Sequence, residues 1–493
     1  MDFDDYLKFD AVGLAQLVAA GEVSATDLMR TAQKRAEQVN PRVNAIVNPL
    51  HEHAEQRLAG QLGGTFAGVP FLLKDLHQDL AGTPTSAGCR ALAGRPVART
   101  STVVQRWLDA GLVIFGKTNT PEFGAKGVTE PQLFGPARNP WNLDRTPGGS
   151  SGGAAAAVAA GIVPVAGASD GGGSIRIPAA CTGLVGLKAG RGLIPHGPDE
   201  SEPLNGLATQ GVVSRSVRDT AAMLDVLAGA DPVAAYAPAL PSTPFLDGLD
   251  RPPAQLRIGY TTASAIRKTP HPEATRAVES AAQLLTDLGH LVEEVDPPHD
   301  DQALAHDFLT IWFVHQAIEV ARIKRETGAS DKGFEHDTHL MAALGRHIGG
   351  MPLQAADERR REHIAALAGL HATHDLLMTP TLGEPPIRVG SLELPAPVQK
   401  LSEAILRARA ARVLELTGIK DQVVQRNLAW VPYTQLANVT GRPAISLPLH
   451  WTPDGLPLGV QFIAPLQGET LLLRLARQLE VAAPWAQRLA PIA

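Results

Sequence analysis

The segment that most constrains the fold of this chain runs from residue 145 to 178 and reads RTPGGSSGGAAAAVAAGIVPVAGASDGGGSIRIP. It places two glycine-flanked serine clusters, one at Ser150 and Ser151 and one at Ser174, on either side of a small-residue helix and a short apolar strand. Glycine beside a serine lets another backbone or a ligand approach closely. We therefore expect both clusters to be tight loops that meet each other, and not parts of a flexible linker.

Short apolar runs alternate with helical patterns along the rest of the chain. The runs typical of strands are AGVPFLLKDL (67–76), LVIFGK (112–117), IVPVAG (162–167), HLVEEV (290–295), DLLMTP (375–380), AISLPL (444–449) and LGVQFI (458–463). The helical patterns span residues 24–39, 102–110, 154–160, 278–288, 300–375, 389–425 and 467–482. This alternation predicts an α/β fold, with a single large mixed β-sheet covered by helices on both faces.

The sequence contains few signals of helix or domain boundaries. Ser24 and Asp27 form a weak capping box at the start of the first long helix, which we expect to end before Pro41. Neither an internal repeat nor a linker rich in Pro, Gly and Ser is present, so we expect one domain over residues 1–493. The helical, charged segments at about 300–375 and 389–430 are expected to form a cap inserted into that domain.

Composition excludes several classes of function. The formal net charge is -6, and lysines and arginines are scattered, so the sequence predicts no nucleic-acid partner. Only Cys89 and Cys181 are present, which is too few for a disulfide framework in a chain of 493 residues. The acidic start MDFDDYLKFD is unlike a signal peptide, and every long apolar run is broken by Gly or Pro. We therefore expect a cytoplasmic protein without a membrane partner.

The serine clusters could bind phosphate or could simply cap helices. A phosphate-binding loop of the Walker type needs a lysine followed by Ser or Thr after its last glycine, and GGSSGGA has none. GASDGGGS does not match the dinucleotide-binding fingerprint either. Taken singly, each serine could merely cap a helix, as most Gly/Ser pairs do.

The arrangement of the second cluster favours a reactive serine. Three glycines before Ser174 allow successive amides to point at one spot, as an oxyanion hole requires. A serine needs a base, but none of the 16 histidines lies in a glycine-bounded segment near the serines. Lys74, at the end of VPFLLK, is placed for burial, which lowers a lysine pKa and makes the free amine available as a base. From the sequence, Lys74 could equally be solvated or paired with Asp75.

Several segments together resemble the amidase signature family of serine hydrolases. They are GVPFLLKDL, GKTNTPEFG, RNPWNLDRTPGGSSGG, DGGGSIRIP, GLVGLK and NVTGRPAISLPLHWTPDGLPLGVQF. The spacing of 24 residues between Ser150 and Ser174 also agrees with the family. The resemblance runs along nearly the whole chain and implies the amidase signature fold, with its core at about residues 65–230.

The resemblance also implies a Ser-cisSer-Lys triad that cleaves amides through an acyl-enzyme, without a metal or cofactor. By position, Ser174 is the nucleophile, Ser150 the bridging serine after a cis peptide bond, and Lys74 the base. The amides of Gly171, Gly172, Gly173 and Ser174 are implied to form the oxyanion hole. A further set supports these loops by hydrogen bonds and consists of Ser151, Asp170 and Arg176.

Two positions depart from the family pattern. Position 171 is glycine where many relatives carry a larger residue, and we expect this change to loosen the oxyanion loop. Ala189 and Gly190 replace the more usual Pro-Thr at a neighbouring turn. Within the family, TEPQLFGPARNPWNLDRTPGGSSGG is most similar to the branch that hydrolyses 6-aminohexanoate cyclic dimers, which are nylon oligomers. Aryl acylamidases and aliphatic amidases share the same motifs.

Other functions stay open from the sequence. A metal-dependent amidohydrolase could use histidines of the helical segment, namely His336, His339, His363, His371 and His374, although H-E-x-x-H is missing. The sequence is also compatible with an amidase-like scaffold that binds without cleaving, and with the amidase subunit of a tRNA-dependent amidotransferase. Trp312, Phe313 and Tyr433 are candidate contacts of a small-molecule amide substrate. The oligomeric state is left open, with a homodimer as one option.

Overall fold

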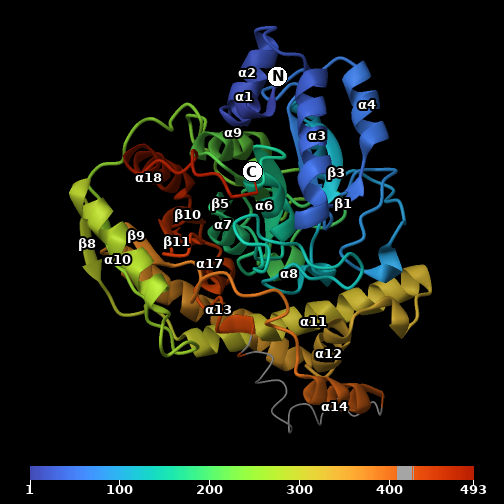
Figure 1. The fold of residues 1–493 in the computed structure, drawn as a ribbon. Helices are drawn as coiled ribbons and strands as arrows, with labels where there is room; N and C mark the ends of the chain where they lie inside the picture. The colour runs from blue at the N-terminus through green and yellow to red at the C-terminus, as the bar shows by residue number, and fades with distance from the viewer. Residues whose placement is uncertain (408–424, 426, 493) are drawn as a thin grey trace.

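The computed structural model describes residues 1–407, 425 and 427–492 (Figure 1). The strands of this part are β1 (Ile46–Pro49), β2 (Pro70–Lys74), β3 (Val113–Thr118), β4 (Val165–Asp170), β5 (Val185–Lys188), β6 (Thr209–Ser214), β7 (Arg257–Tyr260), β8 (Leu291–Glu294), β9 (Leu376–Pro380), β10 (Ala444–Trp451) and β11 (Pro457–Ile463). They form an eight-stranded mixed sheet in the order β4-β6-β5-β10-β11-β9-β7-β8 and a three-stranded mixed sheet in the order β1-β3-β2.

The helices surround these sheets. They are α1 (Phe3–Leu7), α2 (Ala11–Ala19), α3 (Ala25–Val43), α4 (His51–Ala59), α5 (Thr102–Asp109), α6 (Gly152–Ala159), α7 (Arg176–Thr182), α8 (Pro203–Gly206), α9 (Val217–Leu227), α10 (Pro272–Asp287), α11 (Asp301–Thr327), α12 (His336–Gly345), α13 (Gly350–His371), α14 (Ala396–Arg407), α17 (Gln435–Thr440) and α18 (Glu469–Ala482). Short 3₁₀ turns lie at Arg90–Leu92, Glu122–Gly124 and Asp331–Gly333. Among the described helices, none is both long enough and apolar enough to cross a bilayer.

The predicted mixed α/β architecture is confirmed, and the structure adds a division that the sequence did not predict. β2 and β4 lie side by side but are joined through the side chain of Gln78. Its carboxamide accepts from the Lys74 amide at 2.6 Å and donates to the Ala168 carbonyl at 3.1 Å. A Cβ at Gly167 would lie 2.2 Å from the Gln78 Oε1, so only glycine leaves room for this bridge.

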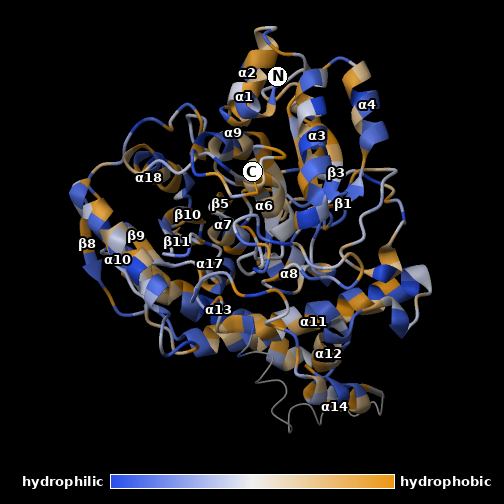
Figure 2. Cartoon of the chain, in the orientation of Figure 1, coloured by the Kyte–Doolittle hydropathy of each residue, from blue (hydrophilic) through white to orange (hydrophobic). Residues whose placement is uncertain are grey.

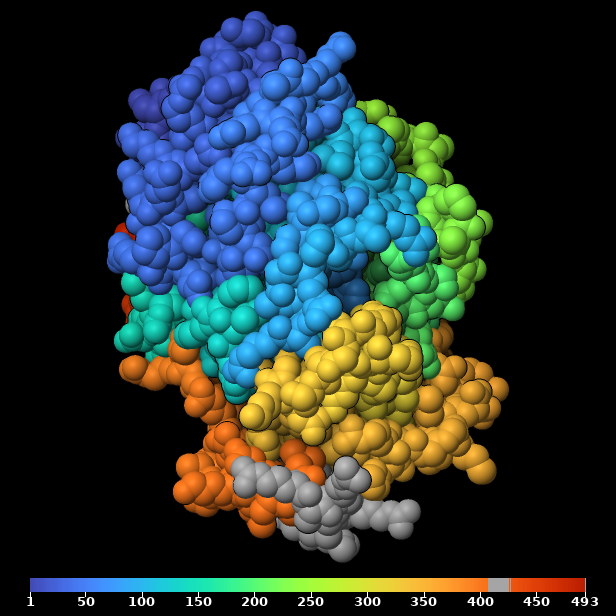
Figure 3. Space-filling view, turned by 90° about the vertical axis from the view of Figure 1, so that its right-hand side faces the viewer, coloured from blue at the N-terminus to red at the C-terminus, as the bar shows by residue number. Residues whose placement is uncertain are grey.

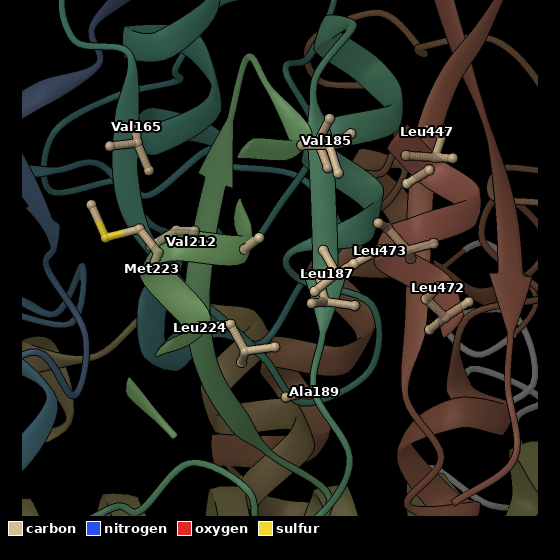
Figure 4. Close-up of a cluster of buried hydrophobic side chains, with 14 of the residues drawn as sticks. Val165, Val185, Leu187, Ala189, Val212, Met223, Leu224, Leu447, Leu472 and Leu473 are labelled. Carbon is tan, nitrogen blue, oxygen red and sulfur yellow. The ribbon is translucent and has the colours of Figure 1, made fainter. Parts of the chain in front are cut away.

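Helices cover both faces of the large sheet, as expected from its alternating side chains. On one face, Val165 of β4 and Val212 of β6 pack with residues of α9 and α18 (Figure 4). On the other face, Ala166, Ala168 and Val213 pack against the alanines of α6. Successive residues of a strand point to opposite faces, so β4 contributes to both hydrophobic clusters. The active-site loops that follow β4 and precede α6 are therefore held from both sides.

Two predicted boundaries are corrected. α3 begins after Ser24, whose hydroxyl accepts from the Asp27 amide, but the helix continues through Pro41 to Val43. A proline in the last turn removes only one amide donor there, and the helix ends at Asn44 with a φ of 49°. The strand expected at residues 162–167 is instead Val165–Asp170, because all six of these residues pair with β6.

The segment predicted to form a cap is helical in the structure. It contains α11, α12 and α13, whose apolar side chains share one hydrophobic cluster with residues of α17. α11 is the longest of the described helices and crosses the lower part of the molecule in Figure 1, above α12 and α14. In Figure 2, α11 shows hydrophilic residues beside hydrophobic ones, as a helix with one exposed side does. In the second expected cap segment, α14 is described and residues 408–424 lie outside the described residues; the domain boundaries stay predictions.

Candidate active site

Lys74 is completely buried at the end of β2, with an exposed fraction of 0%. Its Nζ donates to the Ser150 Oγ at 2.8 Å and to the Ser169 Oγ at 3.0 Å. Burial lowers the pKa of Lys74 to about 7, and the negative charge of Asp170 only partly opposes this shift. The expected burial is thus confirmed, and a large fraction of the amine is neutral near pH 7.

Asp75, the neighbour that could have paired with Lys74, points elsewhere. Its carboxylate accepts from the backbone amide of Ser86 at 3.1 Å and from the Ser86 hydroxyl. Neither a solvated Lys74 ammonium nor a Lys74–Asp75 pair therefore occurs in this structure.

Ser150 lies beside the lysine because its loop is packed against a second backbone segment. The Gly149–Ser150 peptide is cis, and a Cβ at Gly149 would lie 2.6 Å from the backbone carbon of Val128. The neighbouring Ser151 hydroxyl donates to the Ser169 carbonyl and accepts from the Ser169 amide, both at 3.3 Å. Ser169 therefore connects the first serine loop to the end of β4.

Ser174 lies at the surface of a pocket, 8% exposed. No side chain of the described residues is hydrogen-bonded to its hydroxyl. The structure thus brings Lys74, Ser150 and Ser169 into direct contact, and it leaves the Ser174 hydroxyl free to meet a molecule in the pocket.

A buried ion pair holds the second serine loop. Arg176 donates to both carboxylate oxygens of Asp170, at 2.9 and 3.0 Å, and both side chains are 0% exposed. Arg176 also donates to the side chains of Asn438 and Gln461, each at 2.6 Å. Burial alone would raise the pKa of Asp170, but the guanidinium of Arg176 keeps it well below its usual range. Asp170 is therefore a fixed negative charge at the base of the loop.

This carboxylate corrects one expectation about the oxyanion hole. The Gly173 amide donates to Asp170 at 2.7 Å, so its direction is set by the carboxylate and not by the pocket. The amides of Gly171, Gly172 and Ser174 have no acceptor among the described residues. Three of the four expected amides are therefore available to a ligand.

The glycines of this loop are packed against side chains of α8 and of the cap. A Cβ at Gly172 would lie 2.7 Å from the Phe308 Cζ, and one at Gly171 would lie 2.9 Å from the Leu204 Cδ1 and 3.4 Å from Trp312. The Phe308 and Trp312 rings are stacked, with centroids 5.3 Å apart. Leu204 and Trp312 thus occupy the space that a side chain at position 171 would take, and the effect of Gly171 on the mobility of the loop stays a prediction.

The pocket in front of Ser174 is mainly apolar. Its lining includes Phe308, Trp312 and Phe313 of α11, and the full set adds Gly124, Ala125, Lys126, Gly127, Gly172, Ser174, Ile177, Leu309, Asp337, Leu340, Met341, Leu392, Leu394, Asn427, Leu428, Val431 and Gln435. The two charged side chains of this lining, Lys126 and Asp337, form an ion pair with each other. Of the three predicted aromatic contacts, Trp312 and Phe313 line the pocket, whereas the Tyr433 hydroxyl donates to the Thr262 carbonyl away from it.

The five histidines considered as metal ligands do not converge. His363 contacts Asp307, His374 contacts Glu293, and His336 contacts Ser402. No group of three or more potential ligands in the described ranges could hold a metal ion.

Several residues of the site were not predicted. Ser169 and Gln78 contact Lys74, and the Thr434 hydroxyl donates to the Gly172 carbonyl at 2.7 Å. The position of Ser169, directly before Asp170 at a strand end, was the one signal that could have identified it.

Comparisons with known proteins show the family of the chain. The Amidase family pattern matches residues 27–473. The 6-aminohexanoate-cyclic-dimer hydrolase of Pseudomonas sp. (strain NK87) is 37% identical over 488 residues, covering 97% of this chain and 96% of that protein. A structure of 6-aminohexanoate cyclic dimer hydrolase complexed with substrate has a TM-score of 0.90 and 36% identity, covering 99% of both chains. A bacterial aryl acylamidase has a TM-score of 0.84 and 28% identity, covering 97% of both chains.

Proposed function

Because the chain belongs to the amidase signature family, whose members hydrolyse amide bonds, we propose that Ser174, Ser150 and Lys74 perform this hydrolysis as a Ser-cisSer-Lys triad. The observation that carries the proposal is the 2.8 Å hydrogen bond between the fully buried Lys74 amine and the Ser150 hydroxyl. A lysine pKa of about 7 supports the role of base, because only the neutral amine accepts a proton.

In the proposed reaction, neutral Lys74 takes a proton from Ser150 while Ser150 takes the proton of Ser174. The Ser174 oxygen attacks the amide carbon and forms a tetrahedral intermediate. The proton then returns through Ser150 to the leaving nitrogen, the carbon–nitrogen bond breaks, and an ester to Ser174 remains. Water, deprotonated by the same relay, cleaves the ester and regenerates the serine.

The negative oxygen of the intermediate needs hydrogen-bond donors. We assign this role to the amides of Gly171, Gly172 and Ser174, which have no acceptor within the described part of the chain. Ser151, Asp170 and Arg176 act on the loops through their hydrogen bonds and do not take part in proton transfer.

The lining of the pocket favours an uncharged substrate with apolar carbon chains. Lys126 and Asp337 neutralise each other, and most other lining side chains are aliphatic or aromatic. A 6-aminohexanoate cyclic dimer fits this description, because it consists of two amides joined by methylene chains and carries no charge. We propose this dimer, or a related nylon oligomer, as the substrate.

A second candidate is an aryl amide. The stacked Phe308 and Trp312 rings stand beside the oxyanion loop and offer a surface on which an aromatic ring can pack. Hydrolysis measured by mass spectrometry over cyclic and linear aminohexanoate oligomers, anilides and short aliphatic amides decides between the two. Cleavage of anilides alone would overturn the assignment to nylon oligomers.

A serine-directed sulfonyl fluoride tests the nucleophile. We expect one added sulfonyl group on the peptide that contains Ser174, and none in Ser174→Ala. Labelling at another serine, or an absence of labelling in an enzyme that hydrolyses amides, would refute the assignment. A scaffold that binds without cleaving would be recognised by the failure of the whole panel, and an amidotransferase subunit by a partner chain that co-purifies.

Two further expectations remain proposals. Both cysteines are free and buried, which supports a cytoplasmic location. Light scattering on the purified protein would decide whether it forms a homodimer.

A further inference from the structure

Glu122 is a buried carboxylate at the junction between the catalytic core and the cap. It lies in the 3₁₀ turn Glu122–Gly124 and is 4% exposed. Around it, Leu76 and Phe123 of the core pack with Phe334 and α11 side chains of the cap in one small hydrophobic cluster. Figure 3 shows the cap segment, in gold, directly against blue segments from the first part of the chain. An ionisable side chain at such a place is costly unless every oxygen is hydrogen-bonded.

The partners of Glu122 come mainly from the first turn of α12. The backbone amide of Glu335, the N-cap residue of α12, donates to the Glu122 Oε2 at 2.8 Å. The Thr338 hydroxyl of the same turn also hydrogen-bonds to the carboxylate. The Cys89 thiol lies nearby and donates to the Gly333 carbonyl at 3.4 Å. Because the first amides of a helix have no partner within the helix, Glu122 supplies the cap that α12 would otherwise lack.

Two further contacts tie the same turn to the same loop. The Gln132 amide donates to the Glu335 Oε1 at 2.6 Å, and Lys126 forms an ion pair with Asp337. Residues 122–132 and the first turn of α12 are thus linked by several contacts, and Glu122 is the most buried of the four charged residues that make them.

Both partners of this junction line the proposed active site. Gly124, two residues after Glu122, is so close to the bridging serine that a Cβ there would lie 3.1 Å from the Ser150 Oγ. From α12, the side chains of Asp337, Leu340 and Met341 line the pocket in front of Ser174. The position of α12 against this loop therefore sets the distance between the substrate-binding wall and the reacting serines.

We propose that Glu122 is a positioning residue that fixes α12, and with it the substrate-binding wall of the cap, against the loop beside Ser150. The proposal rests on the proposed function, because it assumes that the pocket binds the amide. Glu122 acts through α12 and touches neither the substrate nor the serine hydroxyls. Burial raises the pKa of Glu122 to about 7, so a neutral side chain with the same acceptor oxygen is a fair replacement.

The test compares Glu122→Ala with Glu122→Gln and uses one large and one small probe. The large probe is the 6-aminohexanoate cyclic dimer, or the best substrate of the wild-type enzyme in the amide panel. The small probe is methanesulfonyl fluoride, which reacts with Ser174 without reaching α12. We expect Glu122→Ala to raise KM about tenfold because the Glu335 amide loses its acceptor. The rate of sulfonylation should stay within about twofold of wild type, and Glu122→Gln should restore most of the KM.

The control is Glu319→Ala, on the side of α11 that pairs with Arg322 and does not line the pocket. It should leave both probes unchanged. A purely structural role of Glu122 would lower turnover and sulfonylation together, in proportion to the folded fraction, and that result would overturn the proposal. If Glu122→Ala does not fold, Glu122→Asp replaces it, because this change withdraws the carboxylate by one methylene. The expected result is again a raised KM with an unchanged rate of sulfonylation. A wild-type enzyme that is neither sulfonylated on Ser174 nor active on amides would instead refute the proposed function.

Discussion

The serine loops and the cap helices position their side chains in different ways. In the loops, nearly all side chains are small, and the polar groups of Lys74, Asp170 and Arg176 are held by short hydrogen bonds with no exposure to solvent. In the cap, large side chains such as Phe308 and Trp312 take their positions from packing alone. Changes in the loops should therefore alter the chemistry, whereas changes in the cap should alter which substrate binds.

The strongest test of this difference removes the proposed catalytic groups. Ser174→Ala and Lys74→Met should each lower kcat by about 10⁴-fold or more, and the double variant should be no worse than either single variant, because the residues act as one unit. Steady-state kinetics on the best amide, with circular dichroism to confirm folding, measures this. Additive losses, or full turnover in either variant, would refute the triad.

Two ion pairs, one in the serine loops and one at the cap, should contribute differently to the free energy of unfolding. Asp170–Arg176 in the loops is 0% exposed on both sides, whereas Lys126–Asp337 in the cap junction is 20% and 27% exposed. Arg176→Met leaves a buried charge without its partner and should lower the free energy of unfolding by about 3–5 kcal/mol. Lys126→Met should cost about 1 kcal/mol or less. Urea denaturation measures both, and equal losses would contradict the distinction.

The pH dependence of the reaction tests the lysine alone. Because burial lowers the pKa of Lys74 to about 7, the amine is protonated below that pH and cannot accept a proton. The value of kcat/KM should therefore fall about tenfold per pH unit below the inflection and level off above it. Lys188 is a suitable control, because burial also lowers its pKa to about 7 but its Nζ donates to the Ala189 carbonyl. The Lys188→Met variant should keep the inflection in kcat/KM. If the inflection disappears in this variant, it reports the titration of Lys188 and not that of Lys74.

The smallest effect is expected where loop and cap touch. Gly172→Ala brings a methyl group to about the position that lies 2.7 Å from the Phe308 ring, and it should lower kcat/KM about tenfold. Phe308→Ala should weaken binding of the substrate but remove this clash, so the double variant should recover most of the loss due to Gly172→Ala. A double-mutant cycle on kcat/KM measures the coupling, and additive effects would show that the two side chains act independently.

The sequence predicted the elements whose signals are local. VPFLLK predicted a buried strand that ends in Lys74, and the structure has β2 at that place with every residue buried. The strand after α6 was predicted too early in the chain, because the apolar residues around Pro164 suggested that it begins there. In the structure this strand is β4, whose pairing with β6 extends to Asp170. β6 itself, with the sequence TQGVVS, has no clear alternation and was not predicted.

The site shows the same limit. Lys74, Ser150 and Ser174 were predicted from local motifs and from the family resemblance, and their catalytic roles stay a proposal. The engagement of the Gly173 amide by Asp170 was missed, because a sequence does not show which way a carboxylate turns. The contacts of Phe308 and Leu204 with the oxyanion loop were also missed, since both residues lie far from that loop along the chain and meet it only after folding.

Gln78 joins the two sheets of the molecule through its side chain. Lys74 and the loop of Ser174 belong to different hydrogen-bonded sheets, and one carboxamide stands where a backbone ladder would otherwise join β2 to β4. The alignment of the two halves of the active site therefore depends on a side chain and not on a continuous backbone network. Lys74 reaches across the boundary between the sheets to Ser150 and Ser169, so the residue proposed as the base also links one sheet to the other.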